Sequence, residues 1–271
     1  MLFGLFITVG IAVLSVALRS YESPISQKIG ALGILTASFL AIYYITGSWL
    51  LGVICALSWL FLPWVEILTR IRALRLPREK TLRPKSPPSA EVFPTLEEIS
   101  TQIENEGFKH ISDAGWDWAD YEQFFRLYYN EEDRAQAAIC LNEQHDLSFY
   151  YLRISSRAAE GTVWTTWNYP LSYGLKLPPQ FRINRQRPDQ SFWELYQSHK
   201  SFLRDRALEV GGFPPLDEEQ IQEEMEKDLS DQIEHNLAQG VLVQTSGGEI
   251  KYSWRGMFYL WCQFLLDLVR M

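Results

Sequence analysis

Two runs without a charged side chain, residues 2–18 and 29–65, constrain the fold of this chain more than any other feature of its sequence. An α-helix of about 20 apolar residues crosses the hydrocarbon core of a bilayer, so the first run suffices for a short span. As a single helix, the second run would measure ~55 Å, far more than the ~30 Å core. We therefore expect it to break at Thr46-Gly47-Ser48 into two spans, near 29–46 and 49–65, that form a helical hairpin. A single tilted helix that continues along the membrane interface is the alternative.

The alternative for the first run is a cleaved signal peptide. Such a peptide needs a positively charged segment before the apolar run and small residues at a cleavage site. Only Met1 precedes the run, and Arg19-Ser-Tyr-Glu22 follows it. We expect a retained helix, so that residues 1–65 form an α-helical transmembrane anchor with three spans, near 2–18, 29–46 and 49–65.

A cluster of seven cationic residues, here named the basic collar, follows the last span. It consists of Arg70, Arg72, Arg75, Arg78, Lys80, Arg83 and Lys85. Cationic segments beside spans stay on the cytoplasmic side, and three spans place the loop 19–28, with its own Arg and Lys, on that same side. We expect an integral membrane protein of the bacterial inner membrane with its N-terminus outside and its soluble part cytoplasmic. The collar is expected to bind anionic lipid headgroups, or to form an intramolecular clasp with an acidic helix at 217–239.

The rest of the chain is acidic. Residues 91–271 carry 16 Lys and Arg against 30 Asp and Glu. Nucleic-acid binding depends largely on neutralising phosphates with Lys and Arg, so no nucleic acid is expected as a partner. The cysteines, Cys55, Cys140 and Cys262, are far apart and unpatterned, which argues against a disulfide framework and a zinc site. Nothing in the sequence indicates a cofactor.

A basic, Pro-rich linker at 66–94 is expected to be extended and to lead into a cytoplasmic α+β domain over 95–210. Capping patterns predict three helices, which begin at Thr95, Asp120 and Ser191. Runs of aromatic and β-branched residues predict strands at 134–141, 147–157 and 162–169. This order of elements favours an antiparallel sheet with helices on one face. The stretch around Trp116 and Trp118 is interpreted as a packed corner.

Residues 211–271 are expected to form a separate helix–hairpin–helix unit. Its first helix, 217–239, carries nine Asp and Glu against Lys227 alone, so it would be repelled by phosphate despite a winged-helix outline. Two strands, 241–245 and 249–254, follow it, and then an amphipathic helix runs to Met271. That helix has a wide apolar face and polar residues that exclude a fourth span. We expect burial against the sheet; the alternative is a position in the membrane interface with its tryptophans at headgroup level.

One aromatic-rich segment is the candidate binding surface. It comprises Trp164, Trp167, Tyr169, Tyr173 and Phe181. Aromatic side chains beside a Pro-rich loop can line a ligand groove or a protein partner site. The alternative, a half-buried sheet face packed under the helix at 191–206, is favoured, because aromatic residues are common on such strands.

No catalytic or metal residue is predicted. His199 lies in the apolar stripe of its helix, and a nucleophilic interpretation would pair it with Ser155 or Ser156. Neither serine lies in a sharp Gly-x-Ser-x-Gly turn, so we expect a core histidine with one satisfied nitrogen. A dense carboxylate segment near His110 does not match the spacing of a calcium loop. Its carboxylates are Asp113, Asp117 and Asp120.

Three functional hypotheses remain. The first is a membrane-anchored accessory or scaffold protein that contributes protein–protein contacts to a membrane assembly; the uncharged spans argue against a transport path. The second is a membrane-tethered enzyme, which converging titratable groups in a pocket would favour. The third is a ligand-binding sensor, which an enclosed apolar cavity within 95–210 would favour, whereas a flat exposed aromatic patch would favour the accessory role.

Overall fold

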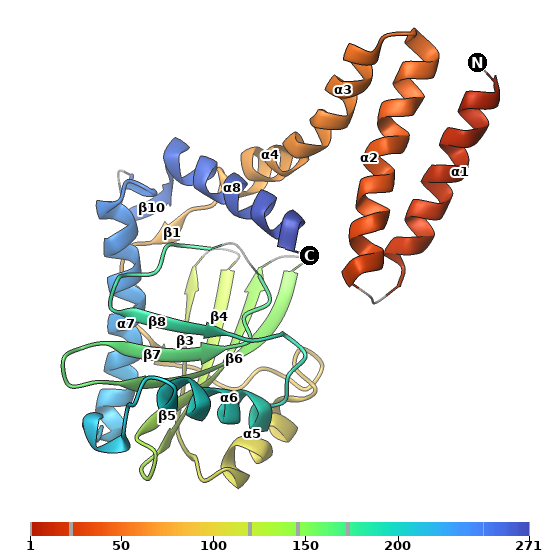
Figure 1. Ribbon diagram of the computed structural model, residues 1–271. Coiled ribbons are helices and arrows are strands. Elements are labelled where there is room, and N and C mark those ends of the chain that lie inside the picture. The colour runs from red at the N-terminus through yellow and green to blue at the C-terminus, as the bar shows by residue number, and fades with distance from the viewer. Residues whose placement is uncertain are drawn as a thin grey trace. The chain divides into compact units, whose positions relative to one another are not determined.

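The computed structural model describes residues 2–21, 24–118, 121–144, 147–171, 174–245 and 247–270. The chain divides into two compact units. The helical unit comprises the residues up to Leu74 and those from Tyr252 onward, and the sheet unit comprises Arg75–Lys251. Figure 1 shows helices alone in the first unit and a twisted sheet with helices in the second.

The helical unit contains three successive apolar helices and the C-terminal helix. They are α1 (Leu2–Arg19), α2 (Pro24–Thr46), a third apolar helix made of α3 (Trp49–Ser58), η1 (Trp59–Phe61), α4 (Leu62–Glu66) and η2 (Ile67–Ile71), and the C-terminal α8 (Trp254–Arg270). Two stretches, Lys28–Thr46 and Trp49–Ile71, are long and apolar enough to cross a membrane. The first apolar helix, at Phe3–Arg19, is shorter.

A sharp turn separates α2 from α3 where the sequence predicted a break. Gly47 has a φ of +69°, a conformation that favours glycine. The Ser48 hydroxyl accepts a hydrogen bond from the Leu51 N–H at 3.5 Å and caps α3. The prediction of two helices within 29–65 is confirmed, and the alternative of one continuous helix is wrong.

The third apolar helix changes its hydrogen-bond pattern along its length. It contains a 3-10 turn at Trp59–Phe61 and a π-helical turn at Ile67–Ile71. Pro63 has no N–H to donate to the Trp59 carbonyl, which interrupts the α-helical pattern. The helix nevertheless continues past Val65, the predicted end of the span.

Glycines allow the apolar helices to approach one another closely. A Cβ on Gly30 of α2 would lie 2.7 Å from the Ser15 carbonyl oxygen of α1, and one on Gly33 would lie 2.0 Å from the Ser15 Oγ. A Cβ on Gly52 of α3 would lie 2.8 Å from the Phe39 ring of α2. Small residues at such contacts are typical of helices that pack inside membranes.

The sheet unit is built on a seven-stranded sheet. In spatial order its strands are β2 (Arg83–Pro84), β3 (Lys109–Trp118), β4 (Tyr121–Asn130), β5 (Ala135–Gln144), β6 (Leu147–Arg157), β7 (Val163–Trp167) and β8 (Phe181–Arg185). Neighbouring strands are antiparallel, except that β7 and β8 are parallel. In register, Tyr128 lies opposite Ala137 and Ile139 opposite Leu152. The three predicted strands are thus found, as β5, β6 and β7.

Helices cover both faces of this sheet. They are α5 (Leu96–Asn105), α6 (Phe192–Arg204) and α7 (Glu218–Ala238), with a short 3-10 turn η3 (Val210–Gly212). The helices α5 and α6 share one buried cluster with Tyr128, whereas Ile221 and Met225 of α7 share another with Leu127. Neighbouring residues of β4 point to opposite faces, so the two clusters lie on opposite sides of the sheet. The expectation of helices on one face is therefore wrong, because α7 covers the second face.

Two further predictions about residues 109–130 are wrong. The segment that was expected to begin a helix at Asp120 forms β4; Asp120 itself lies outside the described residues. The aromatic spacing fits a helical face, but the uninterrupted buried run from Gln123 to Asn130 is what a strand covered on both faces requires. The predicted packed corner near Trp116 is part of β3.

The linker at 66–94 contributes two short strands. β1 (Leu76–Pro77) joins a three-stranded sheet with β10 (Glu249–Tyr252) and β9 (Leu242–Gln244), and β2 pairs with β3. Between these strands, the Leu82 N–H donates to the Glu226 carboxylate at 2.9 Å, and the Leu82 carbonyl accepts from the Gln222 amide at 3.1 Å. The linker is therefore tied to α7. The domain bounds 66–94, 95–210 and 211–271 stay predictions.

Candidate functional site

The helix α6 presents His199 to the sheet. Its N-terminus carries the predicted capping box: the Ser191 hydroxyl accepts from the Glu194 N–H at 3.4 Å, and the Glu194 carboxylate accepts from the Ser191 N–H at 2.9 Å. The helix buries a stripe of residues at helical spacing. These are Phe192, Leu195, Tyr196, His199 and Phe202.

Both imidazole nitrogens of His199 contact hydroxyl groups. The Nε2 atom lies 3.2 Å from the Oγ of Ser156 on β6, and Nδ1 lies 3.0 Å from the Oγ1 of Thr166 on β7. The structure thus brings together one of the pairs that a nucleophilic role would need, whereas Ser155 points to the other face of β6. His199 is 1% exposed, and burial lowers its pKa to about 3, although Asp133 opposes that shift.

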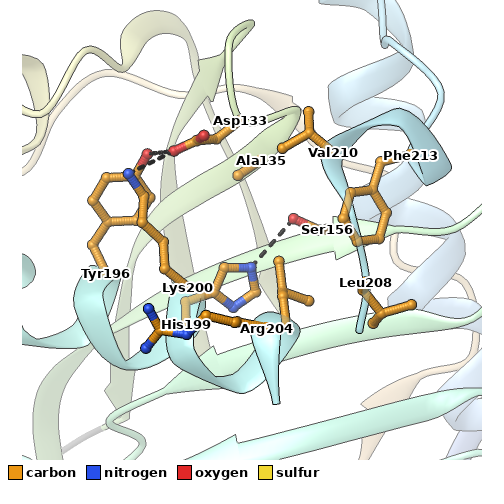
Figure 2. Close-up of a pocket in the computed structure, with 11 residues that line it drawn as sticks. Asp133, Ala135, Ser156, Tyr196, His199, Lys200, Arg204, Leu208, Val210 and Phe213 are labelled. Atoms are coloured by element: carbon orange, nitrogen blue, oxygen red, sulfur yellow. Dashed lines mark hydrogen bonds and ion pairs between the residues drawn. The ribbon is translucent and has the colours of Figure 1, made fainter. Parts of the chain in front are cut away.

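A cavity of about 170 Å³ lies beside His199 and Ser156. Figure 2 shows these two side chains together with those of α6, the β4–β5 turn and the η3 segment. Its apolar walls are Ala135, Leu203, Leu208, Val210 and Phe213, and its polar lining is Asp133, Ser156, Tyr196, His199, Lys200 and Arg204. A cavity of ~150 Å³ with apolar walls holds one benzene molecule, so this volume suits a small compound.

At one side of this cavity, Asp133 contacts the polar groups of Tyr196 and Lys200 (Figure 2). Its carboxylate accepts a hydrogen bond from the Tyr196 hydroxyl and lies 2.8 Å from the Lys200 Nζ. Partial burial opposes ionisation of Asp133, but the hydrogen bonds from Lys200 and Tyr196 outweigh it and lower the pKa of this carboxyl. The ammonium group of Lys200, which lines the cavity, is therefore paired with the carboxylate of Asp133.

His199 and Ser156 are placed as a general base and a nucleophile would be, but the imidazole of His199 is too weak a base for that role. A general base works best when its pKa is near the working pH, and the pKa of His199 is far lower. In Ser-His-Asp triads a carboxylate stabilises the imidazolium; here Nδ1 meets the uncharged Thr166 hydroxyl, itself 3.4 Å from the Asn184 amide. This arrangement holds a neutral imidazole in a fixed orientation and suits binding better than proton transfer.

The opposite sheet face carries a buried charge cluster that sequence reasoning missed. The Arg157 guanidinium contacts Asp228 at 2.6 Å and Glu224 at 2.9 Å, and Arg153 also binds Asp228. Arg153 and Asp228 are 8% and 4% exposed. The spacing was the available signal: two arginines four apart share one face of a strand, and two carboxylates four apart share one face of a helix.

The candidate aromatic surface is divided between the two sheet faces. The Trp164 ring packs against Phe202 of α6 at a centroid distance of 5.5 Å. Trp167 and Tyr169 lie on the other face, 5.6 Å apart, with Tyr169 4.9 Å from Tyr151. Trp167 and Phe181 line a second cavity of about 50 Å³ near Arg153. Tyr173 lies outside the described residues.

The basic collar is distributed over several contacts. Arg78 binds Glu234 of α7 at 2.8 Å, the Lys80 Nζ lies 4.5 Å from the Trp116 ring centroid, and Lys85 contacts Asp117 and Glu122. Burial lowers the pKa of Lys80 to about 8. The Arg72 guanidinium lies 5.0 Å from the Trp254 ring. Arg78 therefore contacts the acidic helix at 217–239, as the clasp alternative expects. Headgroup binding by the collar stays a prediction.

The described carboxylates of the dense segment near His110 form ion pairs with cationic side chains of the same chain. Asp113 forms a two-pronged pair with Arg126, with N–O distances of 2.9 and 3.0 Å, and lies 3.0 Å from the His110 Nε2. Asp117 binds Lys85. Within the described ranges, no group of three His, Cys, Asp or Glu side chains is placed to hold a metal ion.

Comparisons of this chain with protein-family models, with curated proteins and with solved structures found no match.

Proposed function

We propose that this chain is a membrane-anchored accessory protein whose sheet unit contributes protein–protein contacts to a membrane assembly. The observation that carries the anchoring is the exposure of apolar side chains along the stretches 28–46 and 49–71. Ile45, Ile54 and Leu57 are each at least half exposed. Such surfaces are unfavourable in water and match the hydrocarbon core of a bilayer, where helices satisfy their own backbone groups.

The proposed topology has three spans, an external N-terminus and a cytoplasmic sheet unit at a bacterial inner membrane. The cationic loop 19–28 and the collar both fall on the cytoplasmic side in this arrangement, which supports it. The 18 residues of α1 extend ~27 Å, close to the thickness of the hydrocarbon core. The sharp turn at Gly47 then faces outward.

The sheet unit is proposed to act by binding rather than by chemistry. Its buried imidazole is held neutral between two hydroxyls, and its buried carboxylate Asp228 is paired with two arginines. The aromatic residues Trp164 and Trp167 occupy different faces, so they do not form one flat patch. The large exposed aromatic side chain on α6, Trp193, is 56% exposed and is the position at which we expect a partner to touch.

The test begins with native membranes that contain the full chain. Anchoring requires the chain to stay in the pellet after an alkaline carbonate wash. A photoreactive residue at Trp193 should then give one adduct of fixed mass, and the same residue at exposed Glu160 serves as the control position. Native mass spectrometry should find the adducted subunit at fixed stoichiometry; a chain that purifies alone and gives no specific adduct contradicts the accessory role.

The cavity beside His199 supports a second candidate, a ligand-binding role for the same anchored protein. Its apolar walls and few polar groups match the general character of small-molecule sites. Hexanol and hexanoate are suitable probes of different charge. A bound probe should raise the thermal unfolding midpoint of the full chain in detergent, because ligands stabilise the state that they bind. Val210→Trp, at a wall residue that is 39% exposed, should abolish the shift by filling the cavity; an equal shift in this variant contradicts binding there.

A further inference from the structure

The C-terminal helix α8 packs on the last part of the third apolar helix. Its Trp261 indole N–H donates to the Leu60 carbonyl at 2.9 Å. The same ring lies 6.1 Å from the Phe61 ring and 6.0 Å from the Trp64 ring. These described contacts of Trp261 are with the third apolar helix, whereas burial of α8 against the sheet was expected from the sequence. The neighbouring Met257 and Leu260 are almost fully buried.

A second face of α8 carries large apolar side chains that remain exposed. Trp254 is 63% exposed, Phe258 54% and Leu266 53%. These positions are separated by four and eight residues, with the partly exposed Cys262 between the last two, so they form one stripe along the helix. A helix of a soluble protein normally directs such a stripe into the core.

The stripe continues onto the third apolar helix. The Phe258 ring lies 5.5 Å from the Trp261 ring, which contacts Phe61, and Phe61 is 58% exposed. Val65, farther along the same helix, is 61% exposed. The apolar surface of α8 is therefore continuous with the surface of the helix that we propose to cross the membrane.

We infer that α8 is an interfacial helix whose exposed stripe rests in the boundary between lipid headgroups and acyl chains, beside the third apolar helix. Three tryptophans and two phenylalanines at this junction match the aromatic belt of membrane interfaces; they are Trp64, Trp254, Trp261, Phe61 and Phe258. The Arg72 guanidinium, 5.0 Å from the Trp254 ring, supplies a cation where phosphate groups lie. The inference rests on the proposed function, since it requires the third apolar helix to stand in a bilayer.

Lipid-depth quenching tests this placement with the full chain in phosphatidylcholine–phosphatidylglycerol vesicles. An environment-sensitive fluorophore is attached in turn at Phe258→Cys, Ile54→Cys and Trp193→Cys, in a background with Cys55→Ser and Cys262→Ser; Cys140 is buried. Nitroxide lipids labelled near the headgroup or near the chain end act as quenchers. The Trp193 position, an exposed aromatic residue of the sheet unit, is the matched control.

The label at position 258 should be quenched roughly twofold more strongly by the headgroup-side nitroxide, because interfacial helices insert only ~5–10 Å. The label at 54 should respond more to the chain-end nitroxide, and the label at 193 to neither. Quenching at 54 without quenching at 258 overturns the inference and leaves the anchor standing. If position 258 instead cross-links to a second copy of the chain and its label is not quenched by the lipid nitroxides, the inference is also overturned. Loss of quenching at 54 contradicts the proposed anchoring itself.

Discussion

Two buried side chains of the sheet unit, His199 and Asp228, are held by polar partners on opposite faces of the sheet. His199 is held uncharged between Ser156 and Thr166, whereas Asp228 forms ion pairs with two arginines. Removing a partner from such a site leaves a desolvated polar group, which costs more than an exposed contact contributes. The strongest residue-level effects are therefore expected at these two positions.

The first prediction concerns acid stability. The pKa of His199 falls from its usual 6.5 to about 3 on folding, so below pH 6.5 the unfolded chain binds a proton that the folded chain does not. Stability from this group is present above pH 6.5 and is lost as the pH falls toward 3. Between pH 7.5 and 5.5 the loss should be about 1.4 kcal/mol. Urea unfolding of the full chain in detergent should show this difference in the native protein and not in His199→Gln. If the free energy of unfolding of His199→Gln changes with pH as much as that of the native protein, the assignment is wrong. His235→Gln is the control.

The second prediction compares two carboxylates on the same helix. Asp228→Asn leaves Arg153 and Arg157 without their shared buried counter-ion and should lower the free energy of unfolding by about 3–5 kcal/mol. Glu234→Gln removes the exposed pair with Arg78 and should cost less than about 1 kcal/mol. Equal costs in the same urea assay would show that the buried cluster does not stabilise α7 on the sheet.

Residue-level features were predictable from sequence only where the signal was local. The capping box at Ser191 and the placement of His199 in a buried stripe follow from spacing along one helix. The contact between His199 and Ser156 joins positions 43 residues apart and depends on which of two adjacent serines faces α6. The cluster of Arg153 with Asp228 joins positions 75 apart. Such pairs require the register of the sheet, which periodicity alone does not provide.

Among secondary-structure elements, the helix starts at Thr95 and Ser191 and the strands with turns were predictable, and β4 was not. Its residues alternate between two covered faces, so the strand reads as a continuous apolar run that also fits a helix. The contact of α7 with the sheet was missed because the Gly211-Gly212 and Pro214-Pro215 pairs before it suggested a separate unit, although Ile221 and Met225 supply an apolar contact face. Tertiary packing, rather than local propensity, decided both elements.

The third prediction concerns the contact between α1 and α2. Gly30→Val should force these helices apart, because the new side chain meets the Ser15 carbonyl, whereas a Cβ on Gly10 would meet nothing within 4 Å. Cysteines at Gly4 and Tyr44, which adjoin across the two helices, report the contact through a short thiol cross-linker in the Cys55→Ser, Cys262→Ser background. Cross-linking should fall in Gly30→Val and persist in Gly10→Val; equal yields contradict the close packing.

For the whole molecule, the central claim is that the apolar helices place the sheet unit on one side of a membrane. The run of uncharged residues predicted the helices and the break at Gly47. Hydropathy shows whether a stretch is long and apolar enough to cross a membrane, and both candidate stretches, 28–46 and 49–71, meet that criterion. Sidedness depends on charges outside the helices, so it needs a measurement in the membrane itself.

Cysteine accessibility in intact cells tests this claim most directly. Cysteines at Ser48, in the turn between α2 and α3, and at Glu160, in the β6–β7 turn, are introduced one at a time into the Cys55→Ser, Cys262→Ser background, which retains only the buried Cys140. A membrane-impermeant maleimide should label position 48 in intact cells and position 160 only after the membrane is permeabilised. Labelling of position 48 from the cytoplasmic side alone, or of position 160 in intact cells, would contradict the proposed topology.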